Sequence, residues 1–371
     1  MPEVLAVQPF PNQPDKVDPD WLTERLQQSG AIGPEHRVVG FSSSPLGEGI
    51  GMLGIIARFK LEYAGEPGPI ETLVVKCATP AEANRAVAMT FRMYEREVRF
   101  FQLLADRLPE GIPRCYYAEI DLSTGDFILL MEDFFGYRQG DQAAGCDVPD
   151  AELGIDAMAR LHAVWWGATD RAEFAWVPTV DGELHRMMVP ATAGSWDPFI
   201  AKFGHLVAPE IVEVGPRYLA SLADLHTRMG QGPQTLIHGD FRLDNILYGV
   251  RPDQHRIALL DWQGVIVSKG VHDLAYLLSQ NLVTESRRTH ERNLVERYHT
   301  RLGEGGVTGY SLEQCWDDYR LAVLWLFEYA VVIGGALDPA NDRGSAFMSG
   351  LIERSSTAIM DLGLLDLLPA S

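Results

Sequence analysis

The sequence predicts an α+β protein of two lobes, a β-rich first lobe and a mainly helical second lobe. Residues 55–63 alternate apolar and polar side chains with one exception, as strands do, and further strand-like runs continue to residue 131. After Pro149 helical periodicity dominates, apart from an irregular stretch near residues 170–195 and strands around two polar motifs. Such a change along one chain predicts a cleft between the lobes, where ligands usually bind.

The composition fits this size and excludes some partners. The chain has 371 residues, 46% of them hydrophobic, which is enough for one large domain or two lobes. Lys and Arg total 31 against 51 Asp and Glu, a net charge of −20. Such a surface repels nucleic acid and anionic membranes, so neither is an expected partner. Solubility explains the charge most simply; attraction of a cationic acceptor is the alternative.

The cysteines and the N-terminus indicate a cytoplasmic location. The four cysteines show no CxxC spacing and therefore no zinc or redox pattern. The N-terminus lacks a basic start and a long apolar stretch, so no signal peptide is evident. The most apolar segment, residues 321–336, carries Glu328, which favours a buried helix over a membrane span. The oligomeric state stays open.

Residues 1–35 are expected to form an arm and a helix. Residues 1–17 are rich in proline and predict a mobile or surface-draped arm. Asp18 followed by Pro19 supplies an N-cap and a first-turn proline, and the helix that they start is expected to end at Gly30.

Residues 36–134 are expected to form the first lobe. The runs at residues 55–63 and 71–76, joined by the turn GEPGP, predict a β-hairpin. Two more strands are expected at residues 115–120 and 127–131.

A long helix is expected between these strand pairs, from about Ala81 to Leu108. Its apolar stripe comprises Val87, Phe91, Tyr94, Val98, Phe101 and Ala105. The boundary with the second lobe, residues 135–371, is expected near residues 132–136.

A glycine cluster, PLGEGIGMLG, precedes the hairpin. Glycine lets backbone N–H groups approach phosphate oxygens, and Gly47, Gly49 and Gly51 are the candidates for a cover over nucleotide phosphates. The cluster also matches GxGxxG, but a Rossmann turn opens a helix, whereas here a strand pattern follows. An ordinary glycine-rich hairpin is the plain alternative. The sequence has no P-loop motif.

Lys76 closes the apolar strand LVVK, where an ammonium group can bind the α- and β-phosphates of ATP. Such a lysine needs a carboxylate partner. Glu95 and Glu97 both lie on the expected helix near its apolar stripe, and Glu97 is preferred. A strand-end lysine and solvated glutamates are the plain alternatives.

Two polar motifs, HGDFRLDN and DWQG, carry the strongest functional signal. Phosphoryl transfer needs a carboxylate beside the attacking hydroxyl and oxygen ligands for Mg²⁺. Asp240 would accept or orient the hydroxyl proton, and Asn245 and Asp261 would ligate Mg²⁺. Arg242 would neutralise charge on the γ-phosphate. The ordered set therefore predicts an ATP- and Mg²⁺-dependent kinase, although any one aspartate alone would be read as a surface or capping residue.

Two further polar residues are expected to support this loop. His238 is interpreted as a packed, hydrogen-bonded histidine and not as a general base. Asp273, at the start of the helix HDLAYLL, is interpreted as an anchor beneath the loop.

These motifs resemble the aminoglycoside phosphotransferase and choline-kinase-like superfamily, over roughly residues 40–280. The resemblance implies a bilobal protein-kinase-like fold, with nucleotide bound by the first lobe and catalysis and acceptor binding in the second. It implies that Asp240 is the catalytic aspartate, that Asn245 and Asp261 are the metal ligands, and that Lys76 pairs with Glu97.

The same resemblance places an adenine-binding hinge at Glu132 to Phe134. The DWQ motif resembles ecdysteroid-kinase-like proteins. HGDFRLDN resembles kinase domains associated with acyl-CoA dehydrogenases, which act on hydroxyacyl-CoA.

The leading interpretation is therefore transfer of a phosphoryl group from ATP to a hydroxyl of a small molecule. A hydroxyacyl-CoA or an aminoglycoside is an alternative acceptor, and a nucleotide-binding pseudokinase is a non-enzymatic alternative. A protein kinase is disfavoured because eleven residues separate Asp261 from Asp273, which leaves little room for an activation segment. The aromatic residues of the second lobe would suit an apolar acceptor.

Overall fold

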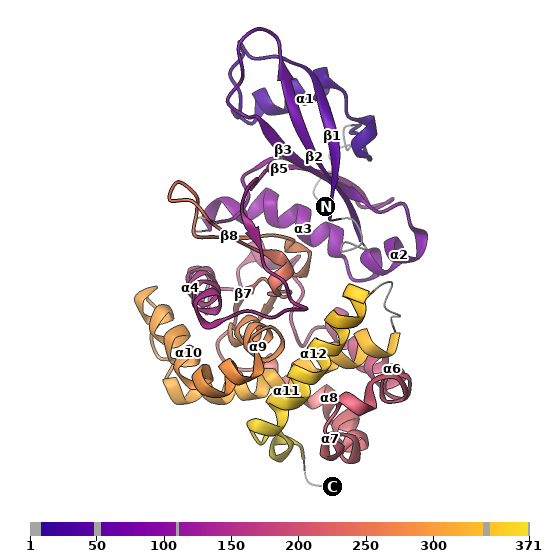
Figure 1. Ribbon diagram of the computed structural model, residues 1–371, viewed down its shortest axis with the longest axis vertical. Coiled ribbons are helices and arrows are strands. Elements are labelled where there is room, and N and C mark those ends of the chain that lie inside the picture. The colour runs from indigo at the N-terminus through magenta and orange to yellow at the C-terminus, as the bar shows by residue number, and fades with distance from the viewer. Residues whose placement is uncertain (1–8, 48–52, 109–110, 337–341, 370–371) are drawn as a thin grey trace. The chain divides into compact units, whose positions relative to one another are not determined.

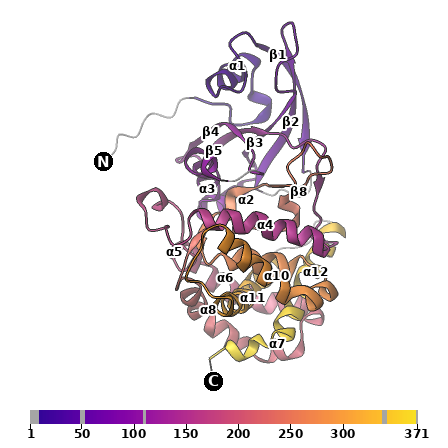
Figure 2. The ribbon, with the colours of Figure 1, turned by 90° about the vertical axis from the view of Figure 1, so that its left-hand side faces the viewer.

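The chain folds into two compact units, seen in a computed structural model that describes residues 9–47, 53–108, 111–336 and 342–369 (Figures 1 and 2). Unit 1 takes residues up to Leu108, Ile112–Gly136 and Asp261–Gly264. Unit 2 takes Pro109–Gly111, Tyr137–Leu260 and Val265–Ser371. Unit 1 is rich in strands and unit 2 is mainly helical, which confirms the predicted α+β class.

Unit 1 is built on one antiparallel sheet of five strands in the order β1-β2-β3-β5-β4. Its helices and strands are α1 (Pro19–Gln28), β1 (Val38–Leu46), β2 (Gly54–Tyr63), β3 (Thr72–Ala78), α2 (Glu82–Thr90), α3 (Met93–Leu103), β4 (Cys115–Asp121) and β5 (Asp126–Glu132).

The predicted hairpin is the pair β2 and β3, in which Ile56 lies opposite Lys76. Alternate residues of both strands face a core that α1 covers. The buried residues of this core include Leu22, Leu26, Ala57, Phe59, Leu61, Leu73, Val75 and Cys77. Helix α1 begins as predicted, because the Asp18 carboxylate accepts a hydrogen bond from the Trp21 amide at 2.9 Å.

The prediction of a single long helix from about Ala81 to Leu108 is wrong, because the structure has two helices there, α2 and α3. Arg92 adopts a left-handed conformation, with φ of 54°, and separates α2 from α3. The break changes the helical phase, so Val87 is exposed instead of joining the apolar stripe with Tyr94 and Val98. Helix α3 buries its apolar side chains Tyr94, Val98, Phe100 and Phe101.

Unit 2 holds the remaining helices and two small sheets, β10-β7 and β6-β8-β9. Its helices are α4 (Val148–Val164), α5 (Glu183–Arg186), α6 (Met188–Phe203), α7 (Pro209–Glu213), α8 (Gly215–Met229), α9 (Val271–Gln280), α10 (Thr284–Glu304), α11 (Leu312–Ala336) and α12 (Asp342–Asp361). Its strands are β6 (Arg138–Gln139), β7 (Thr235–Ile237), β8 (Ile246–Tyr248), β9 (Ile257–Leu259) and β10 (Ile266–Ser268). The stretch near residues 170–195 is less irregular than expected, since it contains α5 and the first half of α6.

Helix α11 is the central helix of unit 2 and packs against α6, α8, α9 and α12. It is long and apolar enough to cross a membrane, but most of it is buried inside the protein. Glu328 on this helix pairs with the buried ring of His226, with 3.0 Å between Oε2 and Nε2. As predicted for residues 321–336, α11 is a buried helix.

Candidate active site

Lys76 lies near the end of β3, where it is buried and shared by two carboxylates. Its Nζ lies 2.7 Å from Oε1 of Glu97 on α3 and 2.8 Å from Oδ1 of Asp261. Of the two glutamates considered as partners, Glu97 makes the ion pair. Glu95 instead binds Arg92 and Arg99 on the surface of α3.

The electrostatics of this cluster follow from its burial. Burial alone would lower the pKa of Lys76, but the charges of Asp261 and then Glu97 outweigh it and raise that pKa above its ordinary value. Burial raises the pKa of Glu97 to about 7, although the Lys76 charge opposes the rise. The cluster therefore holds a permanent ammonium group.

Asp261 is held in unit 1 by its neighbours in sequence. It adopts a left-handed conformation with φ of 63°, and its Oδ2 accepts a hydrogen bond from Gln263 at 3.2 Å. The adjacent Trp262 stacks on Phe100 of α3, with ring centroids 4.0 Å apart and planes 7° from parallel. This stacking keeps the segment that carries Asp261 beside the helix that carries Glu97.

The expected hinge begins at Glu132, the last residue of β5. The amide of Glu132 donates to the Arg114 carbonyl at 2.8 Å, and Phe134 is buried. Between them Asp133 accepts two hydrogen bonds from Arg58, at 2.6 and 2.9 Å. A bidentate pair of this kind fixes the segment on the sheet.

The glycine cluster is described only in part. Gly47 directly follows β1 and has φ of 67°, a conformation that favours glycine. Gly49 and Gly51 lie outside the described residues. Gly54 starts β2, and a Cβ there would lie 3.1 Å from the Cys77 carbonyl oxygen, so the two strands approach closely.

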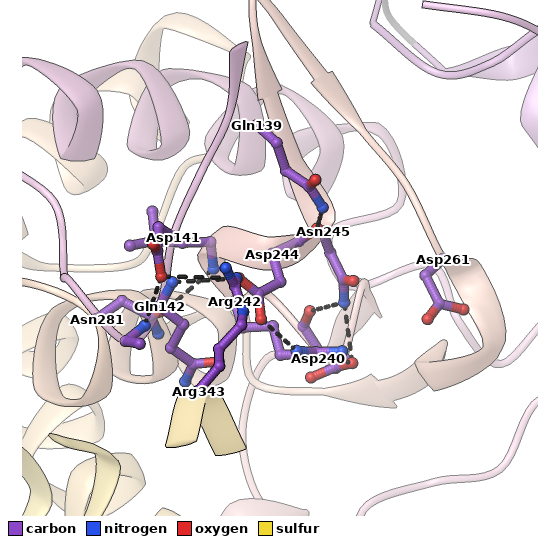
Figure 3. Close-up of polar contacts among 12 residues, drawn as sticks. Gln139, Asp141, Gln142, Asp240, Arg242, Asp244, Asn245, Asp261, Asn281 and Arg343 are labelled. Carbon is purple, nitrogen blue, oxygen red and sulfur yellow. Dashed lines mark hydrogen bonds and ion pairs between the residues drawn. The ribbon is translucent and has the colours of Figure 1, made fainter. Parts of the chain in front are cut away.

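The HGDFRLDN loop follows β7 in unit 2. Its residues Asp240, Arg242, Asp244 and Asn245 lie close together (Figure 3). Asn245 donates from Nδ2 to the Asp240 carbonyl at 3.0 Å and to Asp240 Oδ2 at 2.9 Å. These bonds fix the Asp240 carboxylate. Because the amide nitrogen of Asn245 faces Asp240, the amide oxygen of Asn245 points away from Asp240. The Asp240 side chain is 25% exposed, which leaves it accessible to a ligand.

Arg242 forms an ion pair with the Asp240 carboxylate. Its Nε lies 3.2 Å from Asp240 Oδ2, and its Nη1 lies 3.0 Å from Oδ2 of Asp244. Asp244 is also contacted by Arg343 of α12, at 3.2 Å. Sequence reasoning missed Asp244 and Arg343; the position of Asp244 inside the motif was the only signal for either.

Asp273 lies beneath the loop and is completely buried. Its carboxylate accepts hydrogen bonds from the amides of His238 at 2.8 Å and Gly239 at 2.9 Å, and from the ring of His162 at 3.1 Å. Burial alone would raise the pKa of Asp273, but the hydrogen bond and charge of His162 lower it below its usual range. The His238 ring contacts the Leu260 carbonyl at 2.9 Å, as a packed supporting histidine would.

The donor set is suited to Mg²⁺ more than to a transition metal. Among the described residues, no group of three or more His, Cys, Asp or Glu side chains could hold a metal ion. Magnesium commonly takes one or two protein oxygens and completes its shell with phosphates and water. Asn245 of unit 2 and Asp261 of unit 1, the two predicted ligands, each carry an oxygen of that kind, and their role as ligands stays a prediction.

Comparison with known proteins agrees with the fold. The profile of the ecdysteroid kinase-like family matches residues 48–306, more than half of the chain. No curated protein sequence matches.

Solved structures share the fold at low sequence identity. A candidate aminoglycoside phosphotransferase from Ralstonia eutropha JMP134 is 18% identical, with a TM-score of 0.56, and covers 94% of this chain and 98% of its own. The GDP complex of wild-type aminoglycoside 2'-phosphotransferase-IIIa is 16% identical, with a TM-score of 0.52 and coverages of 92% and 99%. A choline kinase from Cryptosporidium parvum Iowa II is 10% identical, with a TM-score of 0.53 and coverages of 88% and 92%.

These likenesses establish the kinase-like fold that the motifs predicted, and the family match is the more specific of the two findings. The chain belongs to the ecdysteroid kinase-like family.

Proposed function

We propose that this protein transfers the γ-phosphoryl group of ATP to a hydroxyl of a small molecule, with Mg²⁺ as cofactor. The observation that carries the proposal is the buried Lys76 ammonium held by Glu97 and Asp261. A buried lysine is costly unless it is paired, and here the carboxyl groups of Glu97 and Asp261 both lie within ion-pair distance of it. An ammonium group held in this way suits nucleotide phosphates, and the Asp261 carboxylate suits the cation that those phosphates bind.

Each of the predicted residues has a part in this proposal. Lys76, oriented by Glu97, would bind the α- and β-phosphates. The backbone of Glu132 and Phe134 would bind adenine, on a segment that the Arg58–Asp133 pair holds in place. The glycines at 47, 49 and 51 would cover the phosphates. The GDP complex of a protein with the same fold supports nucleotide binding.

Asp240 would receive the acceptor hydroxyl. Asn245 and Arg242 fix its Oδ2, so the carboxylate is already oriented before a hydroxyl arrives. A loose phosphoryl transition state gives the protein little covalent work, and most of the gain would come from this positioning. Mg²⁺, held by Asn245 and Asp261, would neutralise charge on the transferred group.

A nucleotide-binding pseudokinase is the main alternative. It is disfavoured because every residue type that phosphoryl transfer needs is present. The candidate acceptors are an apolar alcohol, a hydroxyacyl-CoA and an aminoglycoside.

The test combines binding and turnover on the purified full chain. Saturating Mg-ATP is expected to raise the melting temperature, because it binds only the folded state. ATP consumption is then measured across amino alcohols, aminoglycosides, sterols and hydroxyacyl-CoAs. The Asp240→Asn variant is expected to keep the thermal shift and to lose roughly 100-fold or more in kcat.

A thermal shift without turnover on any acceptor would favour the pseudokinase. No thermal shift with Mg-ATP, or full turnover by Asp240→Asn, would contradict the proposal.

A further inference from the structure

Five side chains of unit 2 form a row of alternating charge that ends on Asp240 (Figure 3). Asp141 Oδ1 lies 3.6 Å from Arg343 Nη2, and Arg343 Nη2 lies 3.2 Å from Asp244 Oδ1. Asp244 Oδ2 lies 3.0 Å from Arg242 Nη1, and Arg242 Nε lies 3.2 Å from Asp240 Oδ2. We call these five residues the charge row.

Asp244 is the most buried member of the charge row, with a side chain 8% exposed. Its Oδ1 accepts hydrogen bonds from the Gln142 amide and from Arg343, both at 3.2 Å, and its Oδ2 accepts one from Arg242. A carboxylate buried to this extent needs such donors, because an unpaired buried charge is costly. Its position is therefore fixed by three partners.

Arg242 is shared by two carboxylates. The planar guanidinium group reaches Asp240 through Nε and Asp244 through Nη1, so the two aspartates compete for one cation. Arg343 supplies a second cation to Asp244, so the attraction between Asp244 and Arg242 is weaker than it would be without Arg343. Removing Arg343 would leave Asp244 short of positive charge and draw Arg242 away from Asp240.

We propose that Arg343 and Asp244 are positioning residues that hold Arg242 against Asp240. The inference rests on the proposed function, because Asp240 matters only if phosphoryl transfer occurs. Arg343 lies outside residues 48–306, so it is a feature of this chain beyond the part that the family profile matches.

A plain structural role is the competing explanation: Arg343 could simply attach α12 to the rest of unit 2. The opposite end of this helix offers a matched control. Arg288 of α10 pairs with Asp361, the last residue of α12, at 2.9 Å. Its side chain is 45% exposed against 47% for Arg343. Arg288→Gln thus removes a comparable ion pair without touching the charge row.

The experiment measures kcat, KM for ATP and melting temperature for variants of the full chain. The acceptor is the best one found in the panel, or water if only slow ATP hydrolysis is seen. Arg343→Gln is expected to lower kcat about fivefold, the effect of one partly exposed ion pair, with KM for ATP unchanged within about twofold. Arg343→Lys, which keeps the charge, should recover most of the loss, whereas Asp244→Asn should lose more.

A double-variant cycle identifies the route of the effect. If Arg343 acts through Arg242, the double variant Arg242→Gln/Arg343→Gln will be no slower than Arg242→Gln alone. Arg288→Gln should lower the melting temperature about as much as Arg343→Gln and leave kcat unchanged.

Wild-type kcat in Arg343→Gln, or losses that multiply in the double variant, would overturn the inference while leaving the proposed function intact. If the wild-type protein neither binds nor turns over Mg-ATP, the proposed function itself fails.

Discussion

His272 is a completely buried histidine at the start of α9, and its ring packs on Trp325 with centroids 4.8 Å apart. Neither ring nitrogen has a hydrogen-bond partner within the part of the chain that the structure describes. Burial lowers the pKa of His272 to about 4, although the neighbouring Asp273 charge acts in the opposite direction. The ring is therefore neutral in the folded protein well below neutral pH.

This burial predicts a loss of stability in mild acid. Between pH 6.5 and about 4 the unfolded chain binds a proton on His272 and the folded chain does not, so the free energy of unfolding falls as the pH falls. The full shift corresponds to about 3 kcal/mol. In His272→Phe this part of the pH dependence should disappear.

Urea unfolding of both proteins between pH 4 and pH 7 measures the effect. The difference between their unfolding free energies should change steadily with pH below 6.5 and stay constant above it. A difference that is independent of pH would show that His272 is not held neutral.

At the residue scale, sequence reasoning succeeded where a residue's place on an element was informative. Glu97 was preferred over Glu95 from its position relative to an apolar stripe, and Glu97 is the residue that contacts Lys76. Arg343 could not be found in this way, because its contact with Asp244 joins segments about a hundred residues apart and leaves no local pattern. The catalytic and ligand-binding roles of the site residues stay predictions.

At the scale of elements, the break between α2 and α3 depends on one strained residue. Arg92 has φ of 54°, a conformation that costs an L-residue roughly 1–2 kcal/mol. Its guanidinium group forms an ion pair with Glu95 at 2.8 Å, which offsets part of that cost.

Substitutions at Arg92 should separate backbone strain from the ion pair. Arg92→Gly relieves the strain but loses the pair and adds unfolded-state entropy, so the unfolding free energy should change by less than about 1 kcal/mol. Arg92→Val should lose about 2 kcal/mol, because a β-branched residue disfavours this conformation more strongly. Denaturant unfolding of both variants tests this order, and equal losses would show that the ion pair matters more than the backbone.

Elements with strong local signals could be predicted from the sequence. The helix start at Asp18 and the hairpin of β2 and β3 depend on capping, turn chemistry and alternation, which act over a few residues. The break at Arg92 could not, since the apolar pattern continues across it. Strands β6, β8 and β10 have two or three residues each and are too short to show a period.

At the scale of the whole molecule, the net charge is the feature that acts over the longest distance. The net charge of −20 makes long-range repulsion part of the folding free energy. Salt screens that repulsion at distances beyond about 10 Å at 0.1 M ionic strength. The melting temperature should therefore rise when NaCl is increased from 10 mM to about 200 mM, a range over which the Debye length falls from about 30 Å to below 10 Å.

Differential scanning calorimetry across this range, with sucrose as an uncharged control, measures the effect. A melting temperature that falls with NaCl would mean that attractive surface ion pairs outweigh the net repulsion.

Unit 1 is assembled from pieces that are distant in the sequence, because Asp261–Gly264 belong to it while the residues on either side belong to unit 2. A ribosome therefore completes the strands of unit 1 long before it supplies the tryptophan that stacks on Phe100 and the second carboxylate that Lys76 needs. A nascent chain released early would carry an ammonium group that lacks one of its two counter-charges. A gene fragment that ends near codon 136 should thus give the sheet without the Asp261 carboxylate that pairs with Lys76. Recombination between related genes should keep residues up to 136 and the Asp261–Gly264 segment together.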